Sequence, residues 1–346
     1  LYSAYQQWTN EDVISMLHAW SVPTKVERGG RVFPESDKAT DVRNAFMDRY
    51  RKLGGKLQLE ESVTQILVKD GSITGVVTNK GTYTCDAAII ATGGMSYPLT
   101  GSSGDGYEMA KSVGHTIVEL RPSLIPLETK EHWVKDLMGV SLKNVEVSII
   151  AKNKVQTKQF GEMLFAHFGV TGPIILSASH TVTKLLKKKV DPITIEINLK
   201  PALTREVLDK RVQRDFSESQ NKQLLNVLKG LLPSKMIPVI CQLADIEGTK
   251  VIHDITKEER LRLVDTLQHM RLTVHKPRPI AEAIVTAGGI SVKEVDPKTM
   301  QSKLVQGLYM AGEVLDIDAF TGGYNLQAAF STAYVAATHA AEGGES

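Results

Sequence analysis

Cysteine is scarce in this sequence, and its placement suits neither a metal site nor a disulfide framework. Among 346 residues only Cys85 and Cys241 are cysteines, and neither belongs to a Cys-x-x-Cys or Cys/His spacing. Zinc sites and redox disulfides depend on such spacing. We therefore predict no metal site, and the scarcity of cysteine favours a reducing, cytoplasmic setting.

Long apolar runs and a large excess of one charge are also absent. The sequence has no run of about 18 apolar residues, which a membrane helix needs, and no basic-then-apolar signal pattern opens it. The formal net charge is only +2. We expect no membrane span or export signal here, although an address upstream of Leu1 would not be seen. Composition by itself forces no nucleic-acid partner.

Helix patterns are present near the start of the chain, whose length favours two or three domains. Thr9 predicts the cap of an amphipathic helix that Pro23 ends. After a glycine-rich loop at residues 29–34, Ser36 predicts the cap of a second helix, which the glycines at residues 54–55 end.

Strand patterns follow these helices. Residues 117–199 favour strands with a helix around residues 174–186, and residues 202–270 favour helices. We interpret both stretches as insertions, because the buried-strand pattern of residues 87–91 returns only at residues 308–311. Before them, short β-branched runs separated by turn signals predict a strand and a small β-meander. These runs are residues 57–59, 63–68, 73–78 and 83–85.

Each buried strand opens onto a segment that suits a dinucleotide. The first leads into Thr92, Gly93 and Gly94, and the second leads into Gly312 and Glu313. Ligands of open parallel sheets bind beyond the C-terminal ends of strands, where glycine lets backbone N–H groups approach. A plain glycine turn and a solvated acid are the structural alternatives. The two strand exits together favour nucleotide binding, with a carboxylate that accepts hydrogen bonds from ribityl or ribose hydroxyls.

A helix of small residues is predicted close behind the second exit. It opens with TGGYN at residues 321–325 and extends to about residue 341. The free N–H groups of a helix N-terminus favour partial negative charge. In a flavoenzyme such charge develops on the pyrimidine edge of the reduced ring, so this helix would raise the electron affinity of a flavin.

Five motifs in order resemble those of the BaiN/RdsA-type flavoproteins, the bacterial aminoacetone-oxidase-like NAD(P)/FAD-dependent oxidoreductases. The resemblance extends over essentially the whole chain. The motifs are ERGGRVFP (27–34); ATGGMSYP (91–98) with GDGY (104–107); GEMLFAH (161–167) with TGP (171–173); TAGG (286–289); and GEVLD (312–316) with GGYNL (322–326).

The resemblance implies an α/β fold: a glutathione-reductase-like FAD-binding Rossmann domain interrupted by a β-barrel-like domain and a helical domain. The expected FAD domain comprises residues 1–122 and 288–346. The expected barrel-like domain comprises residues 123–200 and 271–287, and the helical domain residues 201–270. The family opens with GxGxxG and an acidic residue that hold the pyrophosphate and ribose. This chain begins after both, so we expect the first βαβ unit to be missing and the fragment to bind FAD poorly.

Carried over residue by residue, the resemblance implies the cofactor contacts. Val63 would lie beside the adenine, Thr92, Gly93 and Gly94 near the phosphates and ribose, and Glu313 on the ribityl chain after Gly312. The flavin ring would be lined by Gly323, Tyr324, Asn325 and Leu326.

Arg31, Tyr97, His167 and Thr286 are the catalytic candidates, because they stand in the matched motifs on the expected substrate side of the flavin. Each has a structural alternative. Arg31 suits an anion or a salt bridge, Tyr97 before Pro98 suits packing, and His167 between two phenylalanines suits a satisfied core position. Thr286 resembles the substrate-facing loop of fumarate-reductase-like flavoproteins. Flavin chemistry needs only orientation, electrostatics and one proton donor from the protein.

Three functions remain open. The first is an FAD-dependent oxidoreductase that passes a hydride between a small organic substrate or NAD(P)H and the flavin. The second, also within the family, is reduction of uracil in ribosomal RNA to dihydrouridine. Residues 200–278 hold 15 Lys/Arg against 10 Asp/Glu, and lysines cluster at residues 184–189, which suits an RNA partner or merely solvated helix faces. The third is a non-catalytic flavin-binding module.

Overall fold

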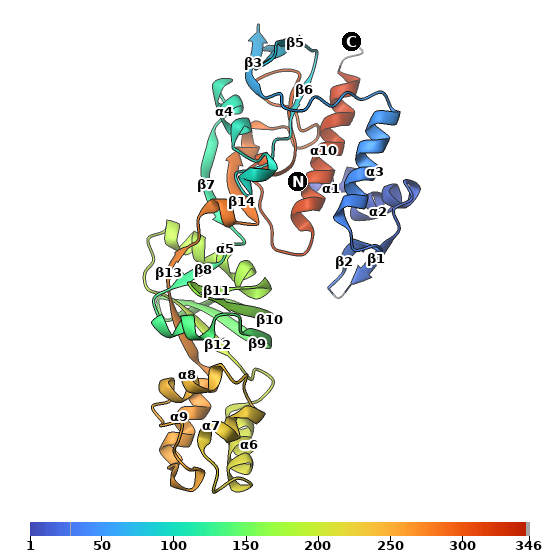
Figure 1. Ribbon diagram of the computed structural model, residues 1–346. Helices are drawn as coiled ribbons and strands as arrows, with labels where there is room; N and C mark the ends of the chain where they lie inside the picture. Colours follow the sequence, from blue (N-terminus) through green and yellow to red (C-terminus); the bar gives the residue numbers. More distant parts are fainter. Residues whose placement is uncertain (28, 344–346) are drawn as a thin grey trace. The chain divides into compact units, whose positions relative to one another are not determined.

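The computed structural model describes residues 1–27 and 29–343, which form two compact units (Figure 1). Unit 1 comprises Leu1–Arg121 and the chain from Ile284 onward, and unit 2 comprises Pro122–Ala283. Arg28, in the motif at residues 27–34, lies outside the described residues. Within the described residues, no helix is both long and apolar enough to cross a bilayer.

Unit 1 contains a parallel strand pair with helices around it. Leu308 of β15 pairs with Ala88 of β6, and Met310 pairs with Ile90, so both predicted buried strands are present and pair with each other in parallel. The strands of unit 1 are β1 (Thr24–Glu27), β2 (Arg31–Pro34), β3 (Val63–Lys69), β4 (Ser72–Thr78), β5 (Thr82–Thr84), β6 (Ala88–Ile90), β7 (Ile117–Ser123), β14 (Val285–Ile290) and β15 (Leu308–Met310). Its helices are α1 (Tyr2–Gln7), α2 (Asn10–Ala19), α3 (Ala39–Lys52), η1 (Pro98–Thr100), α4 (Asp105–Ser112), η6 (Val292–Glu294), η7 (Gly312–Val314) and α10 (Tyr324–Glu342).

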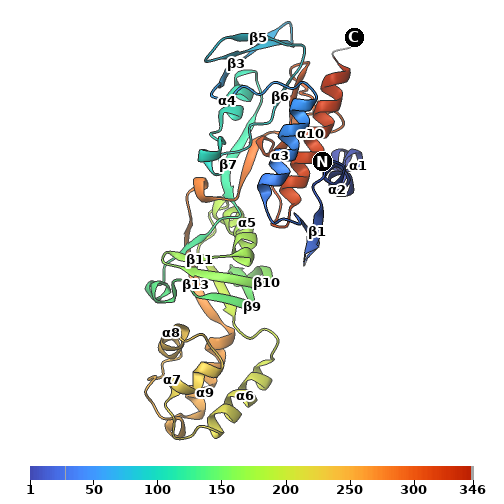
Figure 2. The same ribbon diagram turned by 45° about the vertical axis from the view of Figure 1, so that its right-hand side comes forward.

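Helices α3 and α10 lie side by side in both views of the fold (Figures 1 and 2). Phe46 of α3 stacks on Phe330 of α10 with ring centroids 5.7 Å apart, and Trp20 meets the edge of Phe46. The parallel strands have their own core, in which Leu308, Met310 and Val335 are fully buried. Apolar burial of this kind contributes about 25 cal/mol per Å². The core therefore fixes where the two strand exits lie.

Of the two predicted helix caps, the one at Thr9 is confirmed and the one at Ser36 is not. Thr9 caps α2 as expected: its backbone N–H donates to Asp12, whose own N–H donates to the Thr9 hydroxyl. The predicted cap at Ser36 was wrong, because α3 begins only at Ala39 and has no side-chain cap. The Ser36 hydroxyl instead donates to the Asp41 carboxylate at 2.6 Å.

Two strand predictions near the start also need correction. Residues 57–59 form no strand, because their backbone pairs with no described strand, and Leu57 and Leu59 are 48% and 69% exposed. Apolar alternation without a hydrogen-bonding neighbour does not make a strand. Conversely, the predicted glycine-rich loop contains a hairpin, in which Glu27 of β1 pairs with Arg31 of β2.

Unit 2 is built around a closed barrel in the strand order β10-β11-β8-β13-β12-β9. The inward side chains of Ile149, Phe165 and Ile195 are fully buried. Helices α6–α9 follow β12 and precede β13, and both views place them at one end of the barrel (Figures 1 and 2). The strands are β8 (Leu127–Thr129), β9 (Ser141–Ala151), β10 (Lys154–Ala166), β11 (Gly169–Thr171), β12 (Ile193–Asn198) and β13 (Met270–Pro277). The helices are η2 (His132–Leu137), α5 (Pro173–Lys187), α6 (Arg205–Ser217), α7 (Leu224–Val227), η3 (Leu228–Gly230), α8 (Met236–Leu243), η4 (Ile252–Asp254), α9 (Lys257–Gln268) and η5 (Ile280–Glu282). The barrel strands and these helices thus share one unit, and the expected three-domain boundaries stay a prediction.

A buried histidine gives unit 1 an acid-sensitive position. The His115 side chain is fully buried, with Nε2 2.8 Å from the Ser302 hydroxyl and Nδ1 3.3 Å from Glu294. Burial lowers the pKa of His115, and the Glu294 carboxylate opposes this effect only in part. The folded state therefore binds a proton at His115 more weakly than the unfolded chain does. The free energy of unfolding is unaffected by this group above the ordinary histidine pKa of about 6.5, and it falls as pH drops below that value.

We expect His115→Gln to flatten this acid dependence. Removing one titrating group lowers the slope of unfolding free energy against pH by at most about 1.4 kcal/mol per pH unit between pH 7 and 5. Urea unfolding at a series of pH values measures the slope. His18→Gln, at an exposed histidine of the same unit, is the control. Equal slopes for wild type and His115→Gln would contradict the prediction.

Candidate cofactor site

The two predicted strand exits meet at one edge of the β6–β15 pair. The Ala311 N–H after β15 donates to the Ile90 carbonyl of β6 at 3.0 Å. The first turn of α4 packs against the first exit so closely that a Cβ on Gly106 would collide with the Thr92 hydroxyl. Behind the second exit, the Gly312 N–H donates to Thr332 of α10 at 2.9 Å. These contacts bring Thr92 and Gly312 into one structural unit.

Thr286 ties three chain segments together at this edge. Its N–H donates to Glu313 Oε1 at 2.6 Å, and its hydroxyl oxygen accepts the Met95 N–H at 2.8 Å. The Ser96 hydroxyl lies 2.9 Å from the same oxygen. Thr286 is fully buried, so its contacts position the loop after β6 and the carboxylate after β15.

Glu313 is a half-buried carboxylate with altered electrostatics. Burial raises the pKa of Glu313, and the hydrogen bond from Thr286 opposes the rise. Nearby, burial and the charge of Glu313 also raise the pKa of the Tyr107 hydroxyl, which is buried without a hydrogen-bond partner among the described residues. Sequence reasoning did not single out Tyr107, although it ends the GDGY motif.

The N-terminus of α10 presents an open surface beside the second exit. Gly323 has a φ of +94° and a Cβ there would meet nothing within 4 Å. Tyr324 and Leu326 are 59% and 65% exposed. The Asn325 amide accepts from the Ala319 N–H at 2.9 Å and donates to its carbonyl at 3.0 Å. Asn325 therefore holds the preceding loop, while its neighbours face outward.

The remaining predicted residues are spread over several elements. Val63 begins β3, pairs with Thr78 and packs against the core that contains β6 and β15. Arg31 is on β2, with a guanidinium nitrogen 3.7 Å from a carboxylate oxygen of Glu27. The guanidinium carbon lies 5.5 Å from the centre of the Phe33 ring. These contacts agree with the structural salt bridge considered for Arg31.

Tyr97 and His167 are both exposed. Tyr97 lies on the loop after β6, in a left-handed backbone conformation with φ of 50°. His167 lies in unit 2, in the turn between β10 and β11, and meets Phe168 edge-on. The core position considered for His167 is therefore wrong.

The strand-exit residues fit FAD on structural grounds. Gly94 comes so close to Thr286 that any side chain there would collide, and its added Cβ would lie 3.1 Å from Glu313 Oε1. The site thus offers a carboxylate for hydroxyl groups, an unpartnered phenol, and backbone N–H groups at a helix N-terminus, which are the groups that a ribityl chain and a flavin ring require. Glu313 and the first turn of α10 would hold the cofactor.

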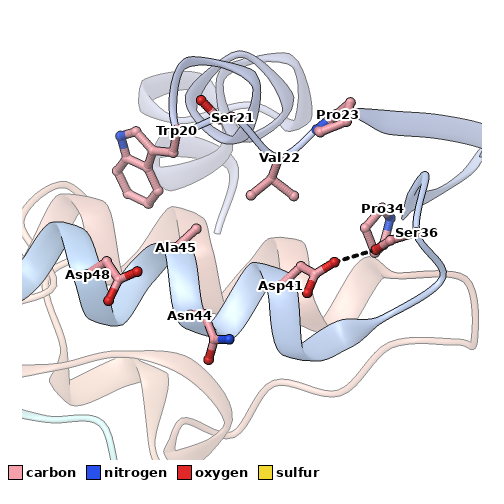
Figure 3. A pocket seen from close by; sticks show the side chains of 10 residues that line it. All are labelled: Trp20, Ser21, Val22, Pro23, Pro34, Ser36, Asp41, Asn44, Ala45 and Asp48. Carbon is pink, nitrogen blue, oxygen red and sulfur yellow. Dashed lines mark hydrogen bonds between the residues drawn. The ribbon is translucent and has the colours of Figure 1, made fainter.

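Two cavities of unit 1 are lined by other residues. One, of about 300 Å³, lies between the end of α2, the β1–β2 hairpin and α3, where Ser36 donates to Asp41 (Figure 3). The other, of about 400 Å³, is lined by Val292, Met300 and Asp316 among others. Neither lining includes a predicted cofactor residue among the described part of the chain.

Comparison with known proteins places the chain in a family. The HI0933-like protein Rossmann domain family matches residues 1–339. A ribosomal RNA dihydrouridine synthase of Haemophilus influenzae is 29% identical, over 97% of this chain and 80% of that protein. A 3-dehydro-bile acid delta(4,6)-reductase of Clostridium scindens is 28% identical, over 91% of this chain and 76% of that protein.

Similarity to solved structures is more distant. The FrdA subunit of an E. coli quinol fumarate reductase variant has a TM-score of 0.46 and 15% identity, with 96% of this chain and 55% of FrdA covered. The chain therefore spans about half the length of that protein. Because the family model matches residues 1–339, the chain belongs to the HI0933-like Rossmann family and is an FAD-dependent oxidoreductase.

Proposed function

We propose that this protein reduces a carbon–carbon double bond conjugated to a carbonyl, and that its substrate is a uracil in ribosomal RNA. The observation that carries the reaction type is the chemistry shared by two relatives of nearly equal identity. Dihydrouridine arises from uridine when the C5=C6 bond next to the C4 carbonyl is saturated. A delta(4,6)-reductase of a 3-dehydro steroid saturates double bonds in conjugation with a 3-keto group.

Saturating such a bond adds a hydride to the carbon β to the carbonyl and a proton to the α carbon. FAD, when bound, supplies the two-electron hydride chemistry, and NAD(P)H is our proposed source of the electrons. The protein has to hold the substrate carbonyl and deliver the proton. Glu313, Gly312 and the first turn of α10 would orient the cofactor, as the contacts above support.

Tyr97 is our proposed proton donor. Tyr97 is 52% exposed on the loop after β6, the same loop that carries Thr92, Gly93 and Gly94. Thr286 anchors this loop through Met95 and Ser96, so its role would be positioning rather than contact with substrate. His167 and Arg31 stay predictions as substrate contacts, because they lie on other elements.

Ribosomal RNA is favoured over a small enone because of charge. Residues 200–278 carry five more basic than acidic residues, whereas the whole chain carries only +2. Affinity for nucleic acid rests largely on such cations, which neutralise phosphates. We do not pursue the non-catalytic alternative, because the chain belongs to the FAD-dependent oxidoreductases.

The test is product analysis. We expect ribosomal RNA incubated with the protein, FAD and NADH or NADPH to yield dihydrouridine, recognised by mass as uridine with two added hydrogens, in step with NAD(P)H consumption. A steroid dienone and free uridine are assayed in parallel. Reduction of the dienone with no dihydrouridine in any RNA would replace the RNA substrate by a small enone and leave the reaction type standing.

A further inference from the structure

A group of exposed lysines gathers at one end of the barrel in unit 2. The sequence shows only the lysines near residue 187 together, but strand pairing brings a second set beside them. Ala151 of β9 pairs with Lys154 of β10 and also with Ile193 of β12. Ile193 follows Lys189 by four residues, which span at most about 14 Å of chain. The lysine cluster consists of Lys152, Lys154, Lys184, Lys187, Lys188 and Lys189, all exposed.

Five of the six lysines form no ion pair within the described part of the chain: Lys152, Lys154, Lys184, Lys188 and Lys189. Asp191 is the acidic residue between the cluster and β12. By contrast, Lys158 further along β10 contacts Glu146 at 3.0 Å. The cluster therefore presents an excess of positive charge at one end of the barrel.

Lys152 occupies a backbone position that lysine does not favour. It and Asn153 form the turn between β9 and β10, with φ of 51° and 57°. A two-residue hairpin turn with both central residues left-handed favours Asn-Gly or similar pairs, because a Cβ strains this conformation.

Lys189 repeats this pattern at the end of α5. Its φ is 55°, its N–H donates to the Leu186 carbonyl, and the next N–H, of Val190, donates to Leu185. This left-handed position after a helix is usually glycine. Two lysines of the cluster thus stand where the local backbone favours other residues, so backbone conformation does not select lysine at either position.

The helix dipole explains only part of the cluster. A helix C-terminus attracts cations, which accounts for Lys184, Lys187 and Lys188 at the end of α5. It does not account for Lys152 and Lys154, which come from a hairpin. The convergence of both segments points to an anionic partner outside the chain.

We propose that the lysine cluster docks the sugar-phosphate backbone of the RNA substrate. This inference rests on the proposed function and adds where the substrate is held. Phosphate contacts fix register and orientation without reading sequence, and exposed lysines such as Lys152 and Lys189 suit that role. The cluster lies at the barrel end opposite the one from which β12 leads into α6, so it forms a second contact surface besides the basic helices.

The test is the double variant Lys152→Gly/Lys189→Gly, measured for affinity to a ribosomal RNA fragment by fluorescence anisotropy at several salt concentrations. We expect binding about tenfold weaker at physiological salt, and the slope of log affinity against log salt to fall by roughly 1.4 to 1.8, or 0.7 to 0.9 for each lost phosphate contact. Glycine adopts the left-handed backbone of both positions without strain, so the midpoint of thermal unfolding should stay the same or rise.

Lys69→Gln is the matched charge control. Lys69 is exposed on β3 of unit 1 and belongs neither to the lysine cluster nor to the basic helices of unit 2, so its loss should not change RNA affinity. Unchanged RNA affinity in the double variant would overturn the proposal. So would cluster-dependent binding to phosphatidylserine vesicles without cluster-dependent RNA binding, because the surface would then be a lipid contact.

Product analysis separates this proposal from the proposed function. If both hold, the double variant raises KM for RNA while kcat at saturating RNA stays unchanged. Wild-type dihydrouridine formation with KM unaltered in the variant would reject the docking surface and keep the function. Cluster-dependent RNA binding without any dihydrouridine would keep the docking surface and reject the function.

Discussion

Tyr97→Phe is expected to slow reduction of the substrate double bond about 100-fold, the lower end of what a positioned proton donor contributes. Tyr97 lies in a left-handed conformation that a bulky side chain rarely adopts, and its carbonyl accepts both the N–H and the hydroxyl of Thr100 at 2.8 and 2.7 Å. Strain of this kind, held in place by neighbours, is typical of functional sites. Loss of the hydroxyl alone leaves that backbone unchanged.

Stopped-flow measurement separates the two halves of the reaction. We expect Tyr97→Phe to leave reduction of bound FAD by NAD(P)H unaltered and to slow only the step with substrate. Tyr97→Asn relieves the backbone strain, because asparagine tolerates left-handed φ, and should raise the thermal midpoint while remaining slow. Tyr2→Phe, at an 80% exposed tyrosine, is the control. Full activity in Tyr97→Phe would remove Tyr97 as the proton donor.

The second large effect is expected from Gly94→Ala, which should weaken FAD binding about 10- to 100-fold. The added Cβ would collide with the Thr286 hydroxyl and lie 3.1 Å from Glu313 Oε1. Thr286 cannot retreat, because it is fully buried and its contacts hold Met95, Ser96 and Glu313. Overpacking of this kind costs about 1–3 kcal/mol. Here the clash would push the two strand exits apart.

Titration of the flavin-free protein with FAD, followed by flavin fluorescence, measures this loss. Gly81→Ala is the matched control, because its added Cβ meets nothing within 4 Å and its backbone is not left-handed. We expect that variant to bind FAD as wild type does. Wild-type affinity in Gly94→Ala would show that the Thr286–Glu313 contact does not shape the cofactor site.

Much of the fold could be predicted where the signal is local. The Thr9 capping box and the apolar runs that became β6 and β15 depend on neighbouring residues. Residues 57–59 and the β1–β2 hairpin were predicted wrongly, because strand formation depends on a partner that local pattern does not show. Ser36 failed as a cap because a nearby carboxylate, Asp41, took its hydroxyl.

The candidate site could be predicted only as far as its motifs extend. Glycine and glutamate at strand exits indicated a nucleotide edge, and parallel pairing of β6 with β15 brings those exits together. The bond from Thr286 to Glu313 joins residues 27 positions apart through tertiary packing, which no spacing predicts. The same holds for the buried hydroxyl of Tyr107.

The strands at the junction of the two units have a further consequence. In unit 2 the first and last strands, β8 and β13, are hydrogen-bonded neighbours, and the Arg278 N–H donates to the Pro126 carbonyl at 3.1 Å. In unit 1 the flanking strands β7 and β14 are likewise neighbours. In each unit, the two strands at the junction are held together by their own sheet. A short turn from the end of β7 to the start of β14 could therefore replace residues 122–283. We therefore expect the barrel and its helices to be transferable as one module between related proteins.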